Sequence, residues 1–273
     1  MSGGHSILVD GQPSGPLVFD MDSPTITRGD GCFEVMRVYG GVAFEWDAHH
    51  DRLHRSAAMM DLKVPPRADL DSWVKQVAAY GPEGLIRVII GRGAAPGQEK
   101  CVVTWHPVPS RPDTMTLFPL TAPWHSAGRP WDLAGGKTLS YAPNMAATRH
   151  AQKEGFDEAL LVADDRTVLE GPVFSVAWVH EGVWETPSLD LLILDSITRR
   201  VVLKLVSESD LPMREGRFGL DRVLEAEEVM VIGTTREVTP VVAVGEQEYQ
   251  WGPVTKRLRE AFVRRVRQSI DGA

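Results

Sequence analysis

The stretch Gly135-Gly136-Lys137-Thr138-Leu139-Ser140-Tyr141 lies at the middle of the 273-residue chain and holds one of only seven lysines. The two glycines allow the backbone to approach other groups closely just before the lysine. Leu139 and Tyr141 predict a partly buried setting, in which the pKa of an amine falls toward neutrality. An uncharged lysine amine can attack a carbonyl group. A single lysine is usually a solvated surface residue, but this segment favours Lys137 as a nucleophile.

The sequence on either side of this segment predicts two domains. A chain of this length exceeds what one hydrophobic core usually organises. Residues 121–134 form an irregular stretch that contains Pro123, Gly128 and Pro130. We therefore expect an N-terminal domain over residues 1–120, a linker over 121–134 and a C-terminal domain over 135–273.

Short strands and helices are mixed along both halves, which predicts an α/β (mixed α+β) fold class. In the first half we expect a hairpin over 33–45, helices over 47–62 and 70–80, and strands over 85–90, 101–105 and 115–120. In the second half we expect helices over 144–153, from 198 and over 253–269, and strands over 159–162, 173–179, 183–185 and 229–232.

The composition excludes several classes of protein. Hydrophobic residues at 43% and charged residues at 24% are typical of a globular protein. A net charge of -8 argues against a nucleic-acid-binding protein, which needs a basic surface. Cys32 and Cys101 are too few for a disulfide scaffold or a cysteine-rich zinc module. No apolar run reaches the roughly 18–20 residues of a membrane span, and the first ten residues lack a secretory pattern, so we expect a cytoplasmic protein.

Other segments carry groups that could bind a charged ligand. Glu170 ends a strand, where a carboxylate could pair with a protonated pyridine nitrogen. Asp195–Arg199 precedes a helical pattern, and the first N–H groups of a helix bind phosphate. Gly233-Thr234-Thr235 follows an apolar strand and offers similar donors, and Arg52 could supply a cation. Taken alone, each has an ordinary structural explanation, such as a turn residue or a helix cap.

Together these segments resemble the class IV aminotransferases, the fold-type-IV pyridoxal phosphate enzymes. The resemblance covers nearly the whole chain, in the correct order. It rests on Gly29–Glu34, His49–Leu53, Lys137–Tyr141, Glu170-Gly171, Ile197–Arg199, Gly233–Val241 and Gly252–Thr255. It implies a small N-terminal α/β domain, a larger C-terminal domain with a β-barrel-like sheet, pyridoxal 5'-phosphate as cofactor, and a homodimer.

The resemblance also implies roles for individual residues. Lys137 would form the internal aldimine and carry a proton between the substrate α-carbon and the cofactor. Glu170 would pair with the pyridine nitrogen, and Tyr141 would hydrogen-bond the phenolic oxygen. The residues implied for the phosphate are Arg52, Ile197, Thr198 and Thr234. The residues implied for the substrate are Phe33, Arg37, Arg92 and Thr235.

The resemblance leaves the reaction and the substrate open. An aminotransferase would move an amino group from an amino acid or amine to a 2-oxo acid, pyruvate or 2-oxoglutarate, by a ping-pong mechanism. The aminodeoxychorismate lyases have a similar lysine segment and release pyruvate by elimination. Phe33 and Arg37 look more like the branched-chain aminotransferases. The D-amino acid enzymes have tyrosine and histidine where this chain has Phe33 and Ala94, but share Arg92. L-branched-chain amino acids, D-amino acids and (R)-amines all remain open as donors.

Three further points qualify these predictions. Relatives often follow the Glu-Gly pair with a serine-rich run, whereas this chain has Pro172–Val176. His50 and His54 could chelate a metal, but no third ligand lies nearby in the sequence, so we expect no metal site. An inactive relative that only binds partners is disfavoured, because Lys137, Glu170 and Arg52 are all retained.

Overall fold

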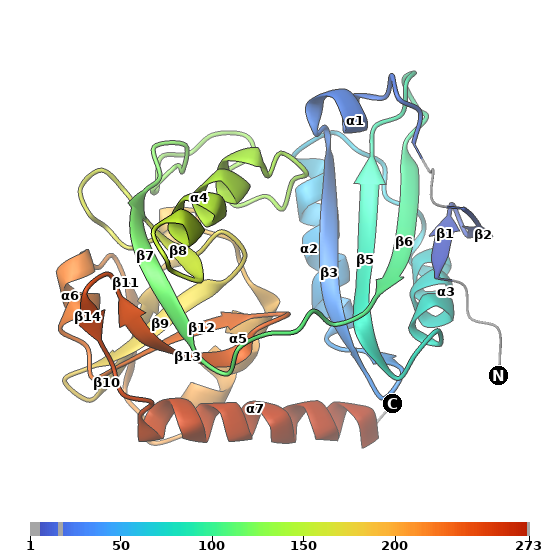
Figure 1. Cartoon of the computed structure of the whole chain (residues 1–273). Coiled ribbons are helices and arrows are strands. Elements are labelled where there is room, and N and C mark those ends of the chain that lie inside the picture. Colours follow the sequence, from blue (N-terminus) through green and yellow to red (C-terminus); the bar gives the residue numbers. More distant parts are fainter. Residues whose placement is uncertain (1–5, 16–18, 272–273) are drawn as a thin grey trace. The chain divides into compact units, whose positions relative to one another are not determined.

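The computed structural model describes residues 6–15 and 19–271, which form two compact units. Unit 1 comprises the described residues up to 109, residues 136–141 and those from 266 on. Unit 2 comprises residues 110–135 and 142–265. Each unit has its own sheet and its own helices (Figure 1), so the predicted mixed α and β fold class is confirmed.

An antiparallel six-stranded sheet is the frame of unit 1, with the strand order β2-β1-β6-β5-β3-β4. The bounds are β1 (Ile7–Val9), β2 (Gln12–Pro13), β3 (Gly31–Tyr39), β4 (Val42–Ala43), β5 (Glu83–Gly91) and β6 (Lys100–His106). β3 and β4 form the predicted hairpin. Gly40 and Gly41 make its turn with φ values of 57° and 81°, which glycine adopts without strain.

The core of unit 1 lies between this sheet and its helices. The helices are α1 (Pro24–Arg28), α2 (Trp46–Ala58) and α3 (Arg67–Ala78). Cys32 and Met36, on one face of β3, are buried in a cluster with Leu53 of α2 and Leu70 of α3. The sequence predicts a helix as far as residue 62, whereas α2 ends at Ala58, because the backbone of Asp61 is left-handed with φ 50°.

Unit 2 contains an eight-stranded mixed sheet. Seven strands follow the order β11-β10-β9-β12-β13-β7-β8, and β14 pairs with β13. The bounds are β7 (Met115–Thr121), β8 (Glu158–Val162), β9 (Ser175–His180), β10 (Val183–Pro187), β11 (Met213–Gly216), β12 (Glu228–Gly233), β13 (Glu237–Val244) and β14 (Gln247–Glu248). β7 pairs in parallel with both β8 and β13, so this sheet joins strands that are distant in the sequence.

The short segment 167–170 continues this sheet beyond β8. Leu169 donates its N–H to the carbonyl of Leu161 on β8 (3.0 Å). The preceding Val168 donates to the carbonyl of Phe218 (2.8 Å), just after β11 at the opposite end of the strand order. The segment therefore connects the two ends of the sheet, which accounts for its curled, barrel-like form. Glu170 stands at the end of this connection.

The remaining helices belong wholly or mainly to unit 2. They are α4 (Ala142–Lys153), a 3-10 turn (Leu189–Leu191), α5 (Ile197–Ser207), α6 (Leu220–Leu224) and α7 (Pro253–Asp271). Ala147 and Ala151 of α4 are buried in one cluster with Leu169, Leu191 and Ile193. In the part of the chain that the structure describes, no helix is long and apolar enough to cross a membrane.

The contact-based division differs from the predicted domain bounds at two places. The sequence predicts β7 in the first domain, but this strand pairs with β8 and β13, so unit 2 begins at Ser110. The sequence predicts the Lys137 segment at the start of the second domain, but this segment bridges to β3 through Cys32 and Thr138 and belongs to unit 1. Both differences arise from strand pairing between residues that are far apart in the sequence.

Candidate active site

Lys137 is held by its backbone against β3 and α2 of unit 1. Its carbonyl accepts the N–H of Phe33 (3.0 Å), and its own N–H donates to Ser56 Oγ (3.0 Å). Two residues on, Leu139 donates its N–H to the carbonyl of Gly31 (2.7 Å). A Cβ at Gly31 would lie 2.6 Å from the Leu139 side chain and 2.8 Å from a β5 carbonyl, so only glycine permits this approach.

The amine of Lys137 lies among aromatic rings. Lys137 Nζ is 4.4 Å from the ring centre of Phe33 and 5.6 Å from that of Tyr141. The two rings meet edge to face with their centres 5.4 Å apart. The structure therefore brings together three of the predicted residues in one unit, and all three side chains are only partly buried, as the sequence predicts for Lys137.

Arg52 lies on α2, one turn before Ser56, and binds a carboxylate that the sequence analysis missed. Arg52 Nε and Nη2 donate to the two oxygens of Glu34 (2.7 and 2.6 Å), and His49 Nδ1 lies 2.7 Å from Glu34 Oε2. Burial alone would raise the pKa of Glu34, but the charge and hydrogen bonds of Arg52 and His49 lower it to about 2. Burial also lowers the pKa of His49. The predicted contact of Arg52 with phosphate stays a prediction.

A pattern in the sequence could have revealed Glu34. Successive residues of a strand alternate between its two faces, so Glu34 shares the buried face of β3 with Cys32 and Met36. A carboxylate on such a face needs a positively charged partner. The helix that packs on this face supplies Arg52.

The two other predicted arginines of unit 1 differ in how fully they are paired. Arg92 donates to Asp30 Oδ2 (2.7 Å) and to the carbonyl of Met60, which gives it a structural role in its loop. Arg37 donates from Nη2 to Glu83 (3.2 Å) and lies 4.9 Å above the ring of Tyr39. Its Nε and Nη1 are buried and have no hydrogen-bond partner among the described residues. Arg37 therefore has spare donors for an acceptor such as a carboxylate.

In unit 2, Glu170 lies in largely apolar surroundings with few polar partners. The backbone N–H of Leu194 is 3.2 Å from both carboxylate oxygens, and His125 Nε2 is 3.3 Å from Oε1. Leu169 and Ile193, the chain neighbours of Glu170 and Leu194, are buried in one hydrophobic cluster. No arginine or lysine in the described part of the chain forms an ion pair with Glu170. His125 was not predicted from the sequence.

The start of α5 lies three residues beyond Leu194. Ser196 caps this helix by accepting the N–H of Arg199. Ile197 and Thr198, both buried, occupy the first two helical positions, where an N–H has no partner within the helix. No other acceptor for these two N–H groups is found among the described residues. Donors of this kind, at the positive end of a helix dipole, suit a phosphate group.

Thr234 and Thr235 lie in the turn between β12 and β13. Arg111 donates from Nη1 to the carbonyl of Thr235, and its Nη2 lies 2.9 Å from Glu237 Oε2. The turn is therefore anchored by an arginine that the sequence analysis missed. The two residues are 124 positions apart, so no local pattern could have revealed the contact.

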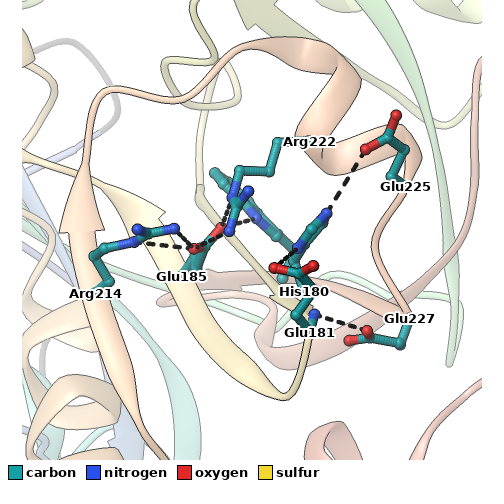
Figure 2. Close-up of polar contacts among 8 residues, drawn as sticks. His180, Glu181, Glu185, Arg214, Arg222, Glu225 and Glu227 are labelled. Carbon is teal, nitrogen blue, oxygen red and sulfur yellow. Dashed lines mark hydrogen bonds and ion pairs between the residues drawn. The ribbon is translucent and has the colours of Figure 1, made fainter.

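Unit 2 contains a second buried carboxylate, which Figure 2 shows with its partners. Glu185 of β10 is fully buried and accepts from Trp178 Nε1 (2.9 Å), Arg222 Nε (2.6 Å) and Arg214 Nε (3.1 Å). Burial would raise the pKa of Glu185, but hydrogen bonds from Arg222, Arg214 and Trp178 lower it. With its oxygens occupied in this way, Glu185 has a structural role.

Comparison with known proteins identifies the family. Residues 31–244, well over half of the chain, match the family model of amino-transferase class IV. The chain belongs to the class IV aminotransferases. A D-alanine aminotransferase of Listeria monocytogenes is 29% identical over 92% of this chain and 91% of that protein. A bifunctional aminodeoxychorismate lyase / D-amino acid transaminase of Mycobacterium tuberculosis is 36% identical over 64% of this chain and 66% of that protein.

A solved structure confirms the fold of this class IV aminotransferase. A fold IV-transaminase from Curtobacterium pusillum superimposes with a TM-score of 0.87 and 28% identity, covering 95% of this chain and 93% of that one. The predicted family and the fold-type-IV architecture are therefore both confirmed. Class IV aminotransferases are pyridoxal phosphate-dependent enzymes, which makes this chain an enzyme of that kind.

The groups present suit pyridoxal phosphate. The N–H groups of Ile197 and Thr198, which have no acceptor among the described residues, suit its phosphate. The carboxylate of Glu170, which has no arginine or lysine partner in the described chain, suits a protonated ring nitrogen. Lys137 supplies a primary amine next to two aromatic rings. These three kinds of group match the phosphate, the ring nitrogen and the aldehyde of the cofactor.

The segment that departs from the family pattern is stabilised by other means. Gly171 donates its N–H to the carbonyl of Phe174 (2.8 Å), and a Cβ at Gly171 would lie 2.2 Å from the Phe174 ring. Asn144 of α4 donates from Nδ2 to the carbonyl of Pro172 (3.1 Å). A buried ring and an amide from another helix therefore hold the turn after Glu170.

Proposed function

We propose that this enzyme transfers an amino group from an amino acid or amine donor to a 2-oxo acid by a ping-pong mechanism. One observation carries the proposal: residues 194–198 place a donor to the Glu170 carboxylate close to the unpartnered N–H groups of Ile197 and Thr198. Glu170 has no arginine or lysine partner among the described residues, and an anion-binding helix start lies on the segment that binds it. These two features suit the two charged ends of the cofactor.

Bound pyridoxal phosphate supplies an aldehyde that takes up amino groups and a protonated ring that accepts electrons from the substrate α-carbon. Lys137 Nζ holds and moves the proton at that carbon, and the rings of Phe33 and Tyr141 confine it. Glu170 keeps the ring nitrogen positively charged by accepting its hydrogen bond. Ile197 and Thr198 bind the phosphate through backbone N–H groups, with Arg52 and Thr234 as further partners.

The substrate carboxylate is the natural partner of Arg37. Its Nε and Nη1, buried and without a partner among the described residues, can donate to a carboxylate without loss of an existing hydrogen bond. The backbone N–H of Thr235 is a second donor to this group. Arg92, already engaged by Asp30 and Met60, contributes by shaping its loop.

D-amino acids are the donors best supported by the relatives. Both relatives described above are named for activity on D-alanine or D-amino acids. L-branched-chain amino acids and (R)-amines are the alternatives, since Phe33 stands where the D-amino acid enzymes have tyrosine. A panel of these donors, tested against pyruvate and 2-oxoglutarate, measures the preference directly.

The test of the proposal starts with the purified enzyme and pyridoxal phosphate. We expect a visible absorbance band and amino transfer, both lost in Lys137→Ala. Lys204→Ala, an exposed lysine on α5, is the matched control and retains both. A colourless wild-type protein that takes up no cofactor would contradict the proposal.

A second candidate function is aminodeoxychorismate lyase. The similarity to a bifunctional lyase and D-amino acid transaminase favours it. Release of pyruvate from aminodeoxychorismate, in the absence of any 2-oxo acid, would support the lyase.

We also infer a homodimer, as the family resemblance implies. In light scattering we expect twice the mass of one chain.

A further inference from the structure

A backbone contact shows which ring nitrogen of His125 carries the proton. The N–H of Ala127 donates to His125 Nδ1 (3.1 Å). A nitrogen that accepts a hydrogen bond carries no proton, so the ring proton of the neutral imidazole lies on Nε2. Nε2 is the atom that faces Glu170 Oε1 at 3.3 Å. His125 is therefore a neutral donor to the carboxylate.

The loop that carries His125 is fixed at both ends to the segments that surround Glu170. At one end Ala122 donates its N–H to the carbonyl of Val162, the last residue of β8 (2.8 Å). At the other end Gly128 donates to the carbonyl of Leu191 (2.8 Å). Within the loop the N–H of His125 donates to Ala122 (3.0 Å), and Arg217 Nη2 donates to Ala127 (3.0 Å). This bonding holds the imidazole in one place.

The surroundings of Glu170 increase the effect of each polar contact. Ala122, Leu191 and Ile193 belong to the buried cluster, so the local dielectric constant is low and a hydrogen bond is stronger than in water. Leu194 shares one N–H between both oxygens, and His125 approaches Oε1 alone. The carboxylate therefore keeps acceptor capacity on Oε2.

We propose that His125 is a positioning residue that orients the Glu170 carboxylate toward the ring nitrogen of the cofactor, an inference that rests on the proposed function. A neutral imidazole fixes the orientation of the carboxylate without neutralising its charge. An arginine in this place would pair with the carboxylate and weaken its attraction for a protonated ring. In this role His125 acts through Glu170.

The test compares two ligands in the cofactor-free protein. One is pyridoxal phosphate, and the other is its analogue in which C–H replaces the ring nitrogen and no hydrogen bond to Glu170 can form. We expect His125→Leu to weaken pyridoxal phosphate binding about tenfold, the effect of one hydrogen bond to a charged group, and to leave the analogue unchanged. His125→Gln, whose amide N–H can replace Nε2, restores binding.

Two controls separate positioning from folding. His150→Leu, at an exposed site on α4, binds both ligands as the wild type does. In a Glu170→Ala background, His125→Leu causes no further loss, because the two residues act as one unit. If His125→Leu does not fold, His125→Asn, whose shorter amide does not reach Glu170, takes its place.

Other outcomes would overturn the inference. Equal weakening for both ligands would show a merely structural role for His125, and unchanged binding of pyridoxal phosphate would show no role toward Glu170. A wild-type protein that binds no pyridoxal phosphate would overturn the proposed function, and this inference with it. If the wild type and His125→Leu bind pyridoxal phosphate equally well, only the inference about His125 is overturned, and the proposed function stands.

Discussion

Glu170 and Glu185 are two glutamates of unit 2, both set among apolar side chains and both bound by a ring N–H, but they differ in the charge around them. Glu185 accepts from Arg214, Arg222 and Trp178 and is fully buried. Glu170 has a histidine and one backbone N–H as partners, and its side chain is 15% exposed. The charge of Glu185 is compensated by two arginines, whereas the charge of Glu170 has no arginine or lysine partner among the described residues and its side chain reaches solvent.

This difference distinguishes a carboxylate with a structural role from one that we propose acts in the reaction. Two guanidinium groups offset the desolvation cost of burying Glu185, so its charge is compensated within the protein. The partners of Glu170 are neutral donors, which orient it but leave its charge for a further cation. In a class IV aminotransferase the protonated ring nitrogen of the cofactor is such a cation. The same residue type thus stabilises the sheet at one place and, in our proposal, serves the chemistry at the other.

The largest effect is expected from Glu170→Gln. Loss of the negative charge opposite the ring nitrogen should lower the rate of amino transfer by a factor of about 10² to 10³, as for other removed electrostatic groups. The free energy of unfolding of the cofactor-free protein should change little. Steady-state kinetics and urea unfolding measure the two quantities, and a rate close to that of the wild type would remove Glu170 from the chemistry.

Glu185→Gln should show the opposite pattern. Arg214 and Arg222 lose their counter-charge, so we expect the free energy of unfolding to fall by about 3 kcal/mol. The loss is no larger because part of each guanidinium reaches solvent. The rate per folded molecule should be unchanged. Thermal and urea unfolding of the cofactor-free protein check the first expectation, and a loss of rate without a loss of stability would contradict the structural role.

Acid provides a test on the buried carboxylate of unit 1. Glu34 has a pKa lowered from 4.5 to about 2, because the effects of Arg52 and His49 exceed that of burial. A lowered folded pKa gives stability that is present above the unfolded pKa and is lost as the pH falls through the folded value. We therefore expect unfolding free energy to decrease between pH 4.5 and about 2. Glu34→Gln should be less stable at neutral pH and show a flatter dependence in this window.

A small effect is expected at the turn after Glu170. Asn144→Ala removes the amide that donates to the Pro172 carbonyl, and we expect a loss of about 1 kcal/mol in unfolding free energy. The rate should fall only slightly, since Gly171 and Phe174 still hold the turn. Arg149→Ala, at an exposed site on α4, is the matched control. A large loss of rate would show that Asn144 also orients Glu170.

The sequence was sufficient to propose those site residues that lie in short local motifs. Lys137, Glu170 and Ile197-Thr198 each stand in a short segment whose glycines, strand end or helix start indicate their chemistry. The hairpin at β3 and the fold class were predicted from local periodicity and turn residues. These features need no knowledge of the distant chain.

The sequence was insufficient where function depends on distant pairs. His125 contacts Glu170 across 45 residues, and Arg111 contacts Thr235 across 124. Neither residue has a local pattern that distinguishes it from a solvated side chain. The start of unit 2 at Ser110 has the same cause, because β7 belongs to a sheet whose other strands come much later.

We propose that Glu170, and not Glu185, is the carboxylate that serves the reaction. The most direct measurement is the initial rate of amino transfer by Glu170→Gln and Glu185→Gln, with the best donor and equal concentrations of folded, cofactor-saturated protein. The account predicts a rate lowered by about 10² or more for Glu170→Gln and a wild-type rate for Glu185→Gln. Equal rates for the two variants would contradict it.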